Sequence, residues 1–163
     1  MLLEKSAVFI VVSVQLSVLS FRFSGAGLSV VRLSVYTELM IRDVTDLEIY
    51  NLGLENLSPL YRLTILVPPE HRKIKYQANE AGEKIPAQIA EGFGKKSSPR
   101  EFCRFLLMAL GSSDEVITHI REIKILSQTY SRINPEECDK VIECYKKLSK
   151  KINKLHSSWR RFD

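Results

Sequence analysis

The chain has few of the residues that make tight turns or covalent cross-links. Its 163 residues include seven Gly and six Pro, too few for a β-rich protein with frequent turns. Three Cys are an odd number and cannot form a closed disulfide framework. Hydrophobic residues make up 45% and charged residues 26%, which excludes collagen-like, low-complexity and acidic disordered chains. The length fits one domain, or one domain with a tail.

Residues 1–39 have few charges and differ in pattern from the remainder. Every second residue from Val8 to Val18 is apolar, with Ser13, Gln15 and Ser17 between the later ones, which is strand periodicity. A turn at 24–27 precedes a second alternating run, and the triplet Leu-Ser-Val occurs three times. The segment is therefore unlike the helical pattern that follows it.

Four interpretations of this segment are open. A secretory signal would use Lys5 as its positive region, but Gln15 and several Ser interrupt the apolar run. A membrane span needs about 20 apolar residues, and this run is shorter and more polar. A β-hairpin is the third interpretation. We favour the fourth, an appendage resembling translated repetitive DNA ahead of a start at Met40, with the folded domain at 40–163.

The remaining residues repeat a helical pattern four times. A helical stripe predicts a first helix over 46–66 that Pro59 should distort. The residues of the stripe are Leu47, Tyr50, Leu54, Leu57, Tyr61 and Leu63. A second helix is expected over 70–91, with Pro86 inside it. The run Gly92-Phe93-Gly94 should end it, with one Gly in the left-handed conformation.

The last two helices have clear starts. Ser98 precedes Pro99 and Glu101 follows, which is typical of a capping box, and Asn134-Pro135 repeats the device. The third helix could exceed 30 residues by its apolar spacing, and the fourth carries an unbroken three-and-four stripe. Short connections make neighbours antiparallel, so we expect an all-α, up-down-up-down four-helix bundle with a non-core N-terminal arm.

Catalytic groups and metal ligands do not stand out. His71, His119 and His156 do not pair with each other or with Cys at metal-ligand spacing. The three Cys are isolated, so we expect small buried thiols. The loop after Gly92 lacks the spacing of a phosphate-binding loop. We therefore expect no cofactor, no metal and no enzyme activity.

Positive charge is concentrated in the fourth helix, although the net charge is only +5. Between Lys140 and Phe162 the chain has eight Lys and Arg but only one acid, Glu143. Such a ridge suits phosphate backbones, while a solvated polar face is the alternative. A second basic group surrounds the start of the third helix, where free N–H groups could bind phosphate. The predicted nucleic-acid-binding residues are Lys95, Lys96, Arg100, Lys140, Lys147, Lys150, Lys151 and Lys154.

Several motifs carry a resemblance to a known family. They are Asp46-Leu-Glu-Ile-Tyr50, Tyr61-Arg-Leu63, Ile85-Pro-Ala-Gln-Ile-Ala-Glu-Gly-Phe-Gly94 and the run from Glu101 to Ser112. Over residues 41–160 the chain resembles bacterial four-helix-bundle proteins named for reading frames in intervening sequences of large-subunit ribosomal RNA genes. That family is similar to the Avd accessory proteins of diversity-generating retroelements.

The resemblance implies a cytoplasmic, non-enzymatic bundle that assembles into a homo-oligomer, a pentamer by family likeness. It also implies partners such as RNA, DNA or a reverse transcriptase, and no membrane. Family members often carry a basic pair in the second helix before the Pro, whereas residues 77–82 here are neutral to acidic. The sequence therefore predicts a nucleic-acid-associated protein that uses the fourth helix, with a protein-interaction scaffold as the alternative.

Overall fold

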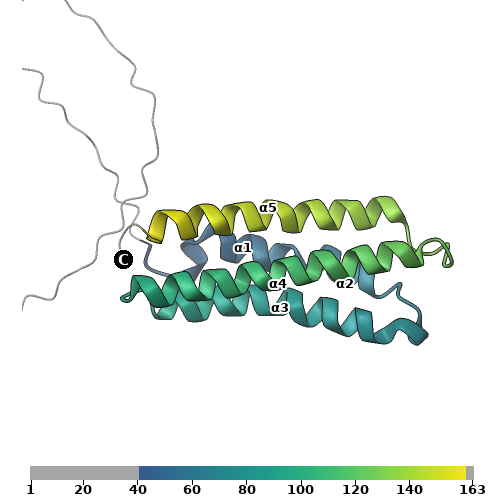
Figure 1. Cartoon of the computed structure of the whole chain (residues 1–163), viewed down its shortest axis with the longest axis horizontal. Helices are drawn as coiled ribbons and strands as arrows, with labels where there is room; N and C mark the ends of the chain where they lie inside the picture. Colours follow the sequence, from purple (N-terminus) through teal and green to yellow (C-terminus); the bar gives the residue numbers. More distant parts are fainter. Residues whose placement is uncertain (1–40, 161–163) are drawn as a thin grey trace, which may run out of the picture. The chain divides into compact units, whose positions relative to one another are not determined.

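The computed structural model describes residues 41–160, and residues 43–160 belong to one compact unit (Figure 1). Every interpretation of residues 1–39 lies outside the described residues. The elements are η1 (Val44–Asp46), α1 (Glu48–Glu55), α2 (Leu57–Thr64), η2 (Pro69–His71), α3 (Arg72–Gly94), α4 (Pro99–Leu126) and α5 (Pro135–Trp159). Within the described range all regular elements are helical, so the all-α four-helix bundle is confirmed.

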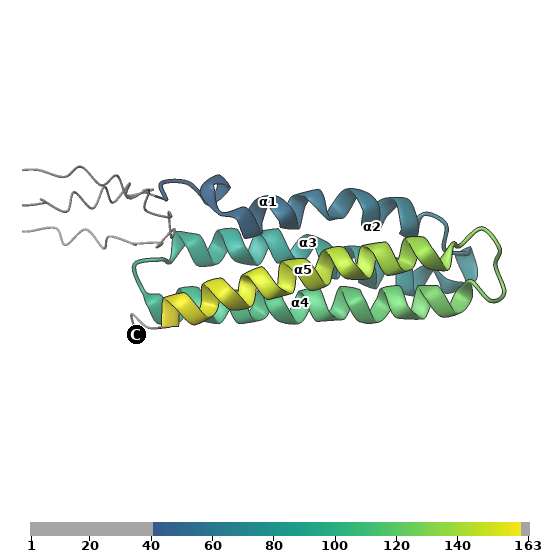
Figure 2. The ribbon, with the colours of Figure 1, turned by 90° about the horizontal axis from the view of Figure 1, so that it is seen from above.

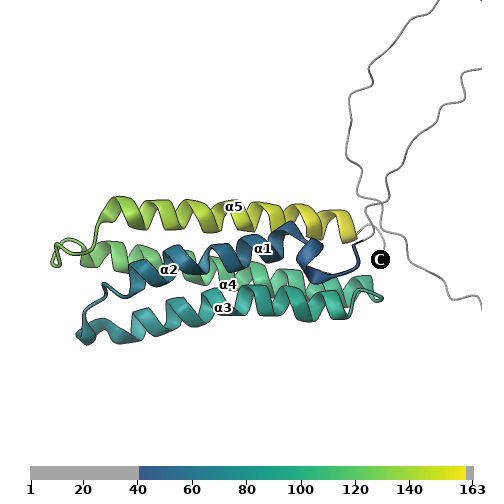
Figure 3. The same cartoon turned by 180° about the vertical axis from the view of Figure 1, so that it is seen from behind.

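Contacts between the helices show that neighbours are antiparallel (Figures 1 and 2). Helices α3 and α4 pair Gln88 with Ser112, and α4 and α5 pair Lys124 with Asp139. The segment α1–α2 packs on α3 and α5, and the Tyr61 hydroxyl donates to the Glu83 carboxylate of α3. The bundle is therefore up-down-up-down, with α1 and α2 together as its first member (Figure 3).

The first helical member of the bundle is divided into α1 and α2 close to Pro59, where a distortion was predicted. Helix α1 ends at Glu55, α2 begins at Leu57, and Pro59 is the third residue of α2. Because Pro59 has no N–H, it cannot donate to the Glu55 carbonyl and continue the ladder. Asn56 at the break is buried; its side chain donates to the Cys144 carbonyl of α5 at 3.4 Å.

The buried face of this first member agrees only in part with the predicted one. Leu47 and Leu63 are buried as expected, whereas Leu54 and Tyr61 are 44% and 39% exposed. The buried positions within α1 and α2 and at the break between them follow a four-and-three spacing that includes one Gly and one Asn. They are Ile49, Gly53, Asn56, Leu60 and Leu63. The small Gly53 faces Pro86 of α3, so large apolar residues alone did not identify this face.

Helix α3 ends at Gly94, inside the run from Gly92 to Gly94 that was expected to end it. Neither Gly92 nor Gly94 has a positive φ, so the predicted left-handed cap is wrong. Gly92 instead permits close packing: a Cβ there would lie 2.6 Å from the Phe105 Cβ and 3.1 Å from Phe102. Gly82 is similarly crowded by Leu60.

The two predicted N-caps are present. The Ser98 hydroxyl accepts from the Glu101 N–H at 3.4 Å, and the Asn134 side chain accepts from the Glu136 N–H at 2.8 Å. The predicted capping box at Ser98 is not closed: the Glu101 carboxylate pairs with Arg104 at 2.9 Å, and the Ser98 N–H donates to the Lys95 carbonyl. Helix α4 has 28 residues, slightly shorter than its apolar spacing suggested, because Tyr130 lies in the following connection.

The buried stripes of the long helices match the sequence. Those of α3 and α4 include Ala78, Ala81, Ile85, Ile89, Phe102, Leu106, Ala109, Ser113, Val116, Ile120 and Ile123. That of α5 comprises Cys138, Val141, Tyr145, Leu148, Ile152 and Trp159, while Leu155 is half-buried. These stripes form a single core between the four members.

Substitution of Gly92 by Ala should destabilise the bundle by about 1–3 kcal/mol, because α3 and α4 must separate around Phe105. The matched control is Gly111→Ala on α4, where nothing lies within 4 Å of the added Cβ. That change should stabilise the protein by up to about 1 kcal/mol, since Ala is the better helix former. Urea denaturation measures both; equal effects would contradict the close approach at Gly92.

Tyr61 should contribute to stability in a pH-dependent way. Burial and the 2.7 Å bond to Glu83 raise the pKa of Tyr61 to about 12, above its ordinary value near 10. The contribution is therefore complete below pH 10 and is lost as the pH rises through about 12. We expect the stability advantage over Tyr61→Phe to shrink across this interval, as measured by denaturant titration at each pH. An advantage that stays constant would contradict the pKa shift.

Candidate nucleic-acid interface

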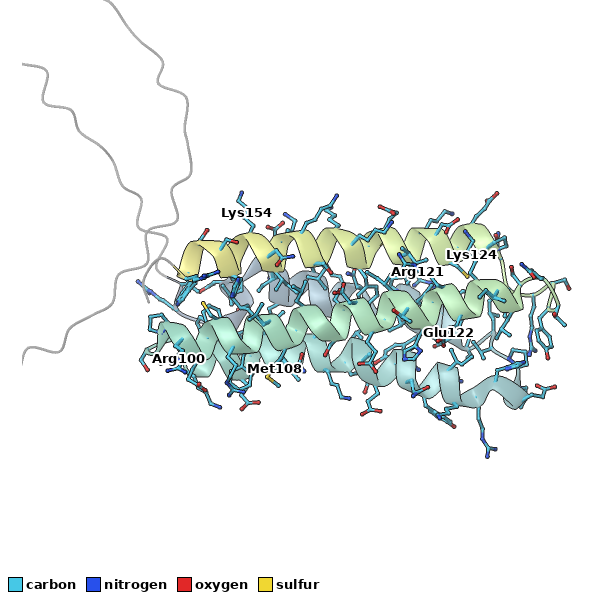
Figure 4. The ribbon with its side chains drawn as sticks, in the orientation of Figure 1. Arg100, Met108, Arg121, Glu122, Lys124 and Lys154 are labelled. Atoms are coloured by element: carbon cyan, nitrogen blue, oxygen red, sulfur yellow. The ribbon has the colours of Figure 1, made fainter. Side chains whose placement is uncertain are left out.

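Helix α5 has an apolar face toward the core and a cationic crest on its opposite side. Lys147, Lys150 and Lys154 lie on this crest; we call them the crest lysines. All three are exposed, and none forms an ion pair with a described residue. With 3.6 residues per turn, they face directly away from the buried stripe that contains Tyr145. Figure 4 shows Lys154 pointing away from the bundle.

The other lysines of α5 are paired with carboxylates. Lys146 and Lys151 lie on the two sides of the crest, while Lys140 lies two turns before Lys147 on the same face. Lys140 contacts Glu137 at 2.6 Å, and Lys146 contacts Glu143 at 2.7 Å. The hydrogen bond from Glu137 raises the pKa of Lys140. Such exposed i,i+3 pairs are weak and can exchange for phosphate.

Lys151 is paired across helices, because its ammonium lies 2.8 Å from Glu48 of α1. The predicted α5 residues are therefore not equivalent. Lys147, Lys150 and Lys154 are available, whereas Lys140 and Lys151 have carboxylate partners.

The cations at the α3–α4 connection are held on aromatic rings. The Lys96 ammonium lies 3.7 Å from the centre of the Phe93 ring, and that of Lys95 lies 4.3 Å from the Phe105 ring. Lys95 also pairs with Glu91 at 2.8 Å. Contacts of this kind orient a cation while leaving part of it solvated. Arg100 is exposed in the first turn of α4.

Of the predicted α5 lysines, the structure brings only the last, Lys154, toward the end of the bundle that holds the α3–α4 connection. The Phe102 ring of α4 contacts the Trp159 ring of α5 edge-on, at 4.5 Å between centres. This contact places the start of α4 beside the end of α5. In Figure 4, however, Arg100 and Lys154 lie on opposite sides of that end. The crest and the connection are therefore two separate cationic regions.

The remaining candidate groups have structural surroundings. His119 lies 3.1 Å from Glu122 and 3.7 Å from Glu115 on its own helix. Within residues 41–160 no group of three potential ligands could hold a metal. Burial raises the pKa of the Cys138 thiol, which makes it a poor nucleophile. Cys103 is also buried.

None of the helices in the described part of the chain is both long enough and apolar enough to span a membrane.

Comparison with known families places the chain beside one whose members are described by a sequence model. A family model described as 23S rRNA-intervening sequence protein matches residues 45–154. The chain belongs to this family. A search of curated proteins found no match.

The match extends over all of α1 to α4 and most of α5. It therefore confirms the family identified from the motifs around Pro86 and Glu101. It also includes every predicted binding residue from Lys95 to Lys154. In this 23S rRNA-intervening sequence protein, the crest lysines are part of the family domain rather than of a separate tail.

Proposed function

We propose that this 23S rRNA-intervening sequence protein is a non-enzymatic, cytoplasmic, homo-oligomeric protein that binds the phosphate backbone of RNA or DNA through the crest of α5. The observation that carries the proposal is the difference between the crest and its flanks. Lys147, Lys150 and Lys154 lack carboxylate partners among the described residues, whereas the lysines beside them have partners.

The spacing of the crest lysines suits a backbone. From Lys147 to Lys154 the helix rises by about 10 Å, so three charges follow one line over two turns. Lysine presents a point charge with no fixed planar geometry, which gives contacts that do not depend on base sequence. Lys95, Lys96 and Arg100 supply a second contact region for a long or folded nucleic acid.

Self-association is supported by apolar side chains on the outer face of the first member. Leu54, Tyr61 and Ile65 follow one another at spacings of seven and four, so they lie on one stripe. They are 44%, 39% and 69% exposed. An oligomer would cover this stripe. It would also present several crests to one nucleic acid, and simultaneous binding of several crests raises the overall affinity above that of a single crest. The same stripe favours a second candidate, a scaffold for a protein partner such as a reverse transcriptase.

Conversion of the three crest lysines to Gln should weaken nucleic-acid binding and reduce its salt dependence. Each lost phosphate contact lowers the slope of log K against log salt by about 0.9 on duplex DNA, so the triple variant should lose about 2.7. Fluorescence anisotropy with labelled duplex DNA and structured RNA over a salt series measures this slope.

The matched control changes Arg62, Lys84 and Lys124 to Gln, which removes the same net charge from α2, α3 and α4. It should change the slope far less. Absence of binding to either nucleic acid at low salt would sink the proposal and leave the protein scaffold. An equal loss in both triple variants would show that total charge, and not the crest, drives binding.

Replacement of Leu54 and Ile65 by Gln should lower the oligomeric state without unfolding the bundle, because both side chains are already exposed. Sedimentation velocity measures the mass, and circular dichroism confirms the helix content. The control is Ile125→Gln on α4, which is 63% exposed and lies away from the stripe. A monomeric wild-type protein at micromolar concentration would refute self-association.

A further inference from the structure

The end of the bundle opposite the α3–α4 connection carries a third cationic group, which lies beside aromatic rings. The α2–α3 and α4–α5 connections both lie at this end (Figures 1 and 3). The His71 and Tyr130 rings join them, edge to face, with centres 5.8 Å apart. Residues of two separate connections thereby form one surface.

Four of the positive charges at this end form no ion pair within residues 41–160. Arg72, Lys73 and Lys75 occupy the first turn of α3, and Arg132 follows Tyr130 in the other connection. No described residue forms an ion pair with any of the four. The nearby acids are Glu70, Glu136 and Glu137, of which Glu137 is paired with Lys140.

The location of these charges is unfavourable for the helix itself. The N-terminus of a helix carries partial positive charge, so basic residues in its first turn cost stability. The first turn of α3 contains no acidic residue, in contrast to the starts of α4 and α5. Locally unfavourable choices of this kind are expected at functional surfaces.

An exposed aromatic ring lies among these cations. Tyr76 is 64% exposed and forms no hydrogen bond with a described residue. Arg72 and Lys73 precede it by four and three residues, so all three side chains share one face of α3. Glu80, one turn further on, is paired with Lys84 at 2.8 Å. A flat ring flanked by cations is the arrangement with which proteins bind single-stranded nucleic acid.

We propose that this end of the bundle binds unpaired nucleotides of RNA, with a base stacked on Tyr76 and adjacent phosphates on Arg72 and Lys73. The inference rests on the proposed function, because both take nucleic acid as the partner. The two proposals concern different surfaces of the bundle. An aromatic ring needs a base whose face is free. Loops and bulges of folded RNA present such bases, whereas a duplex stacks them.

The test compares binding of the full chain to an RNA hairpin with an unpaired loop and to a blunt RNA duplex of the same stem. We expect Tyr76→Ala to weaken hairpin binding at least about fivefold and to leave duplex binding unchanged. Tyr76→Phe should bind as the wild type does, because stacking needs the ring and not the hydroxyl. Ile125→Ala, an exposed apolar control on α4, should have no effect.

A fluorescent base analogue in the loop reports stacking directly. The wild type and Tyr76→Phe should quench 2-aminopurine fluorescence, and Tyr76→Ala should not. Lys73→Gln should weaken hairpin binding and lower its salt slope by about 0.7. Lys84→Gln removes the same charge from a paired lysine of the same helix and should have a smaller effect.

The outcomes separate this inference from the proposed function. Duplex binding that depends on the crest lysines, with no preference for the looped hairpin, would overturn the inference alone. Loss of duplex binding in Tyr76→Ala would also overturn it, provided that circular dichroism shows a folded protein. Tighter binding of a DNA hairpin with the same loop would overturn the assignment to RNA. Failure to bind any nucleic acid would remove both proposals.

Discussion

The close approach of α3 to its neighbours depends on two positions that have no side chain. At Gly92 the backbone of α3 lies against Phe105 and Phe102 of α4, and at Gly82 it lies against Leu60 of α2. A Cβ at either position would overlap atoms already present. Helix α3 can therefore lie close to α4 and to the first member of the bundle. The short distance between α3 and α1 also lets the buried Pro86 pack against Gly53. Well-packed interiors tolerate added methyl groups poorly, so these glycines fix the spacing of three members.

The fourth member is fixed by polar contacts as well as by apolar packing. The Tyr145 hydroxyl donates to the Asn56 carbonyl at 3.4 Å, where α1 gives way to α2. The Asn56 side chain donates to the Cys144 carbonyl, and Ser113 of α4 contacts Ser149 at 2.8 Å. Because buried polar groups must be bonded, these contacts admit one rotation of α5 about its axis. That rotation turns Tyr145 inward and the crest lysines outward.

The distribution of charge follows from this rotation. Acids on α5 or on α1 pair with Lys140, Lys146 and Lys151, but no acid of the described residues forms an ion pair with a crest lysine. At the end of the bundle opposite the α3–α4 connection, the His71 and Tyr130 rings are in contact. This contact places the basic first turn of α3 close to the α4–α5 connection. Both cationic surfaces thus arise where the packing leaves lysine and arginine without carboxylate partners.

Much of the fold was predictable from local patterns. The caps at Ser98 and Asn134, the stripes of α3, α4 and α5, and the distortion at Pro59 depend on residues a few positions apart. The buried face of the first member was predictable only in part: Leu47 and Leu63 lie on it as expected, but the small Gly53 and the polar Asn56 lie on it too. Of the candidate site, the basic character of α5 was visible in the sequence. The basic run before Tyr76 was visible too, but its significance depends on exposure and on the neighbouring connection.

The sequence by itself determined that this protein is helical, where its long helices begin, which family it belongs to and which helix carries most positive charge. These properties are set by hydrophobic period, caps and composition, which act over a few residues. Only the tertiary structure decided which lysines are free. Lys151 and Glu48 are distant in the chain yet 2.8 Å apart, and Lys95 rests on a ring from the next helix. Whether a charge is available depends on what packing brings to it, and packing joins residues that no local pattern connects.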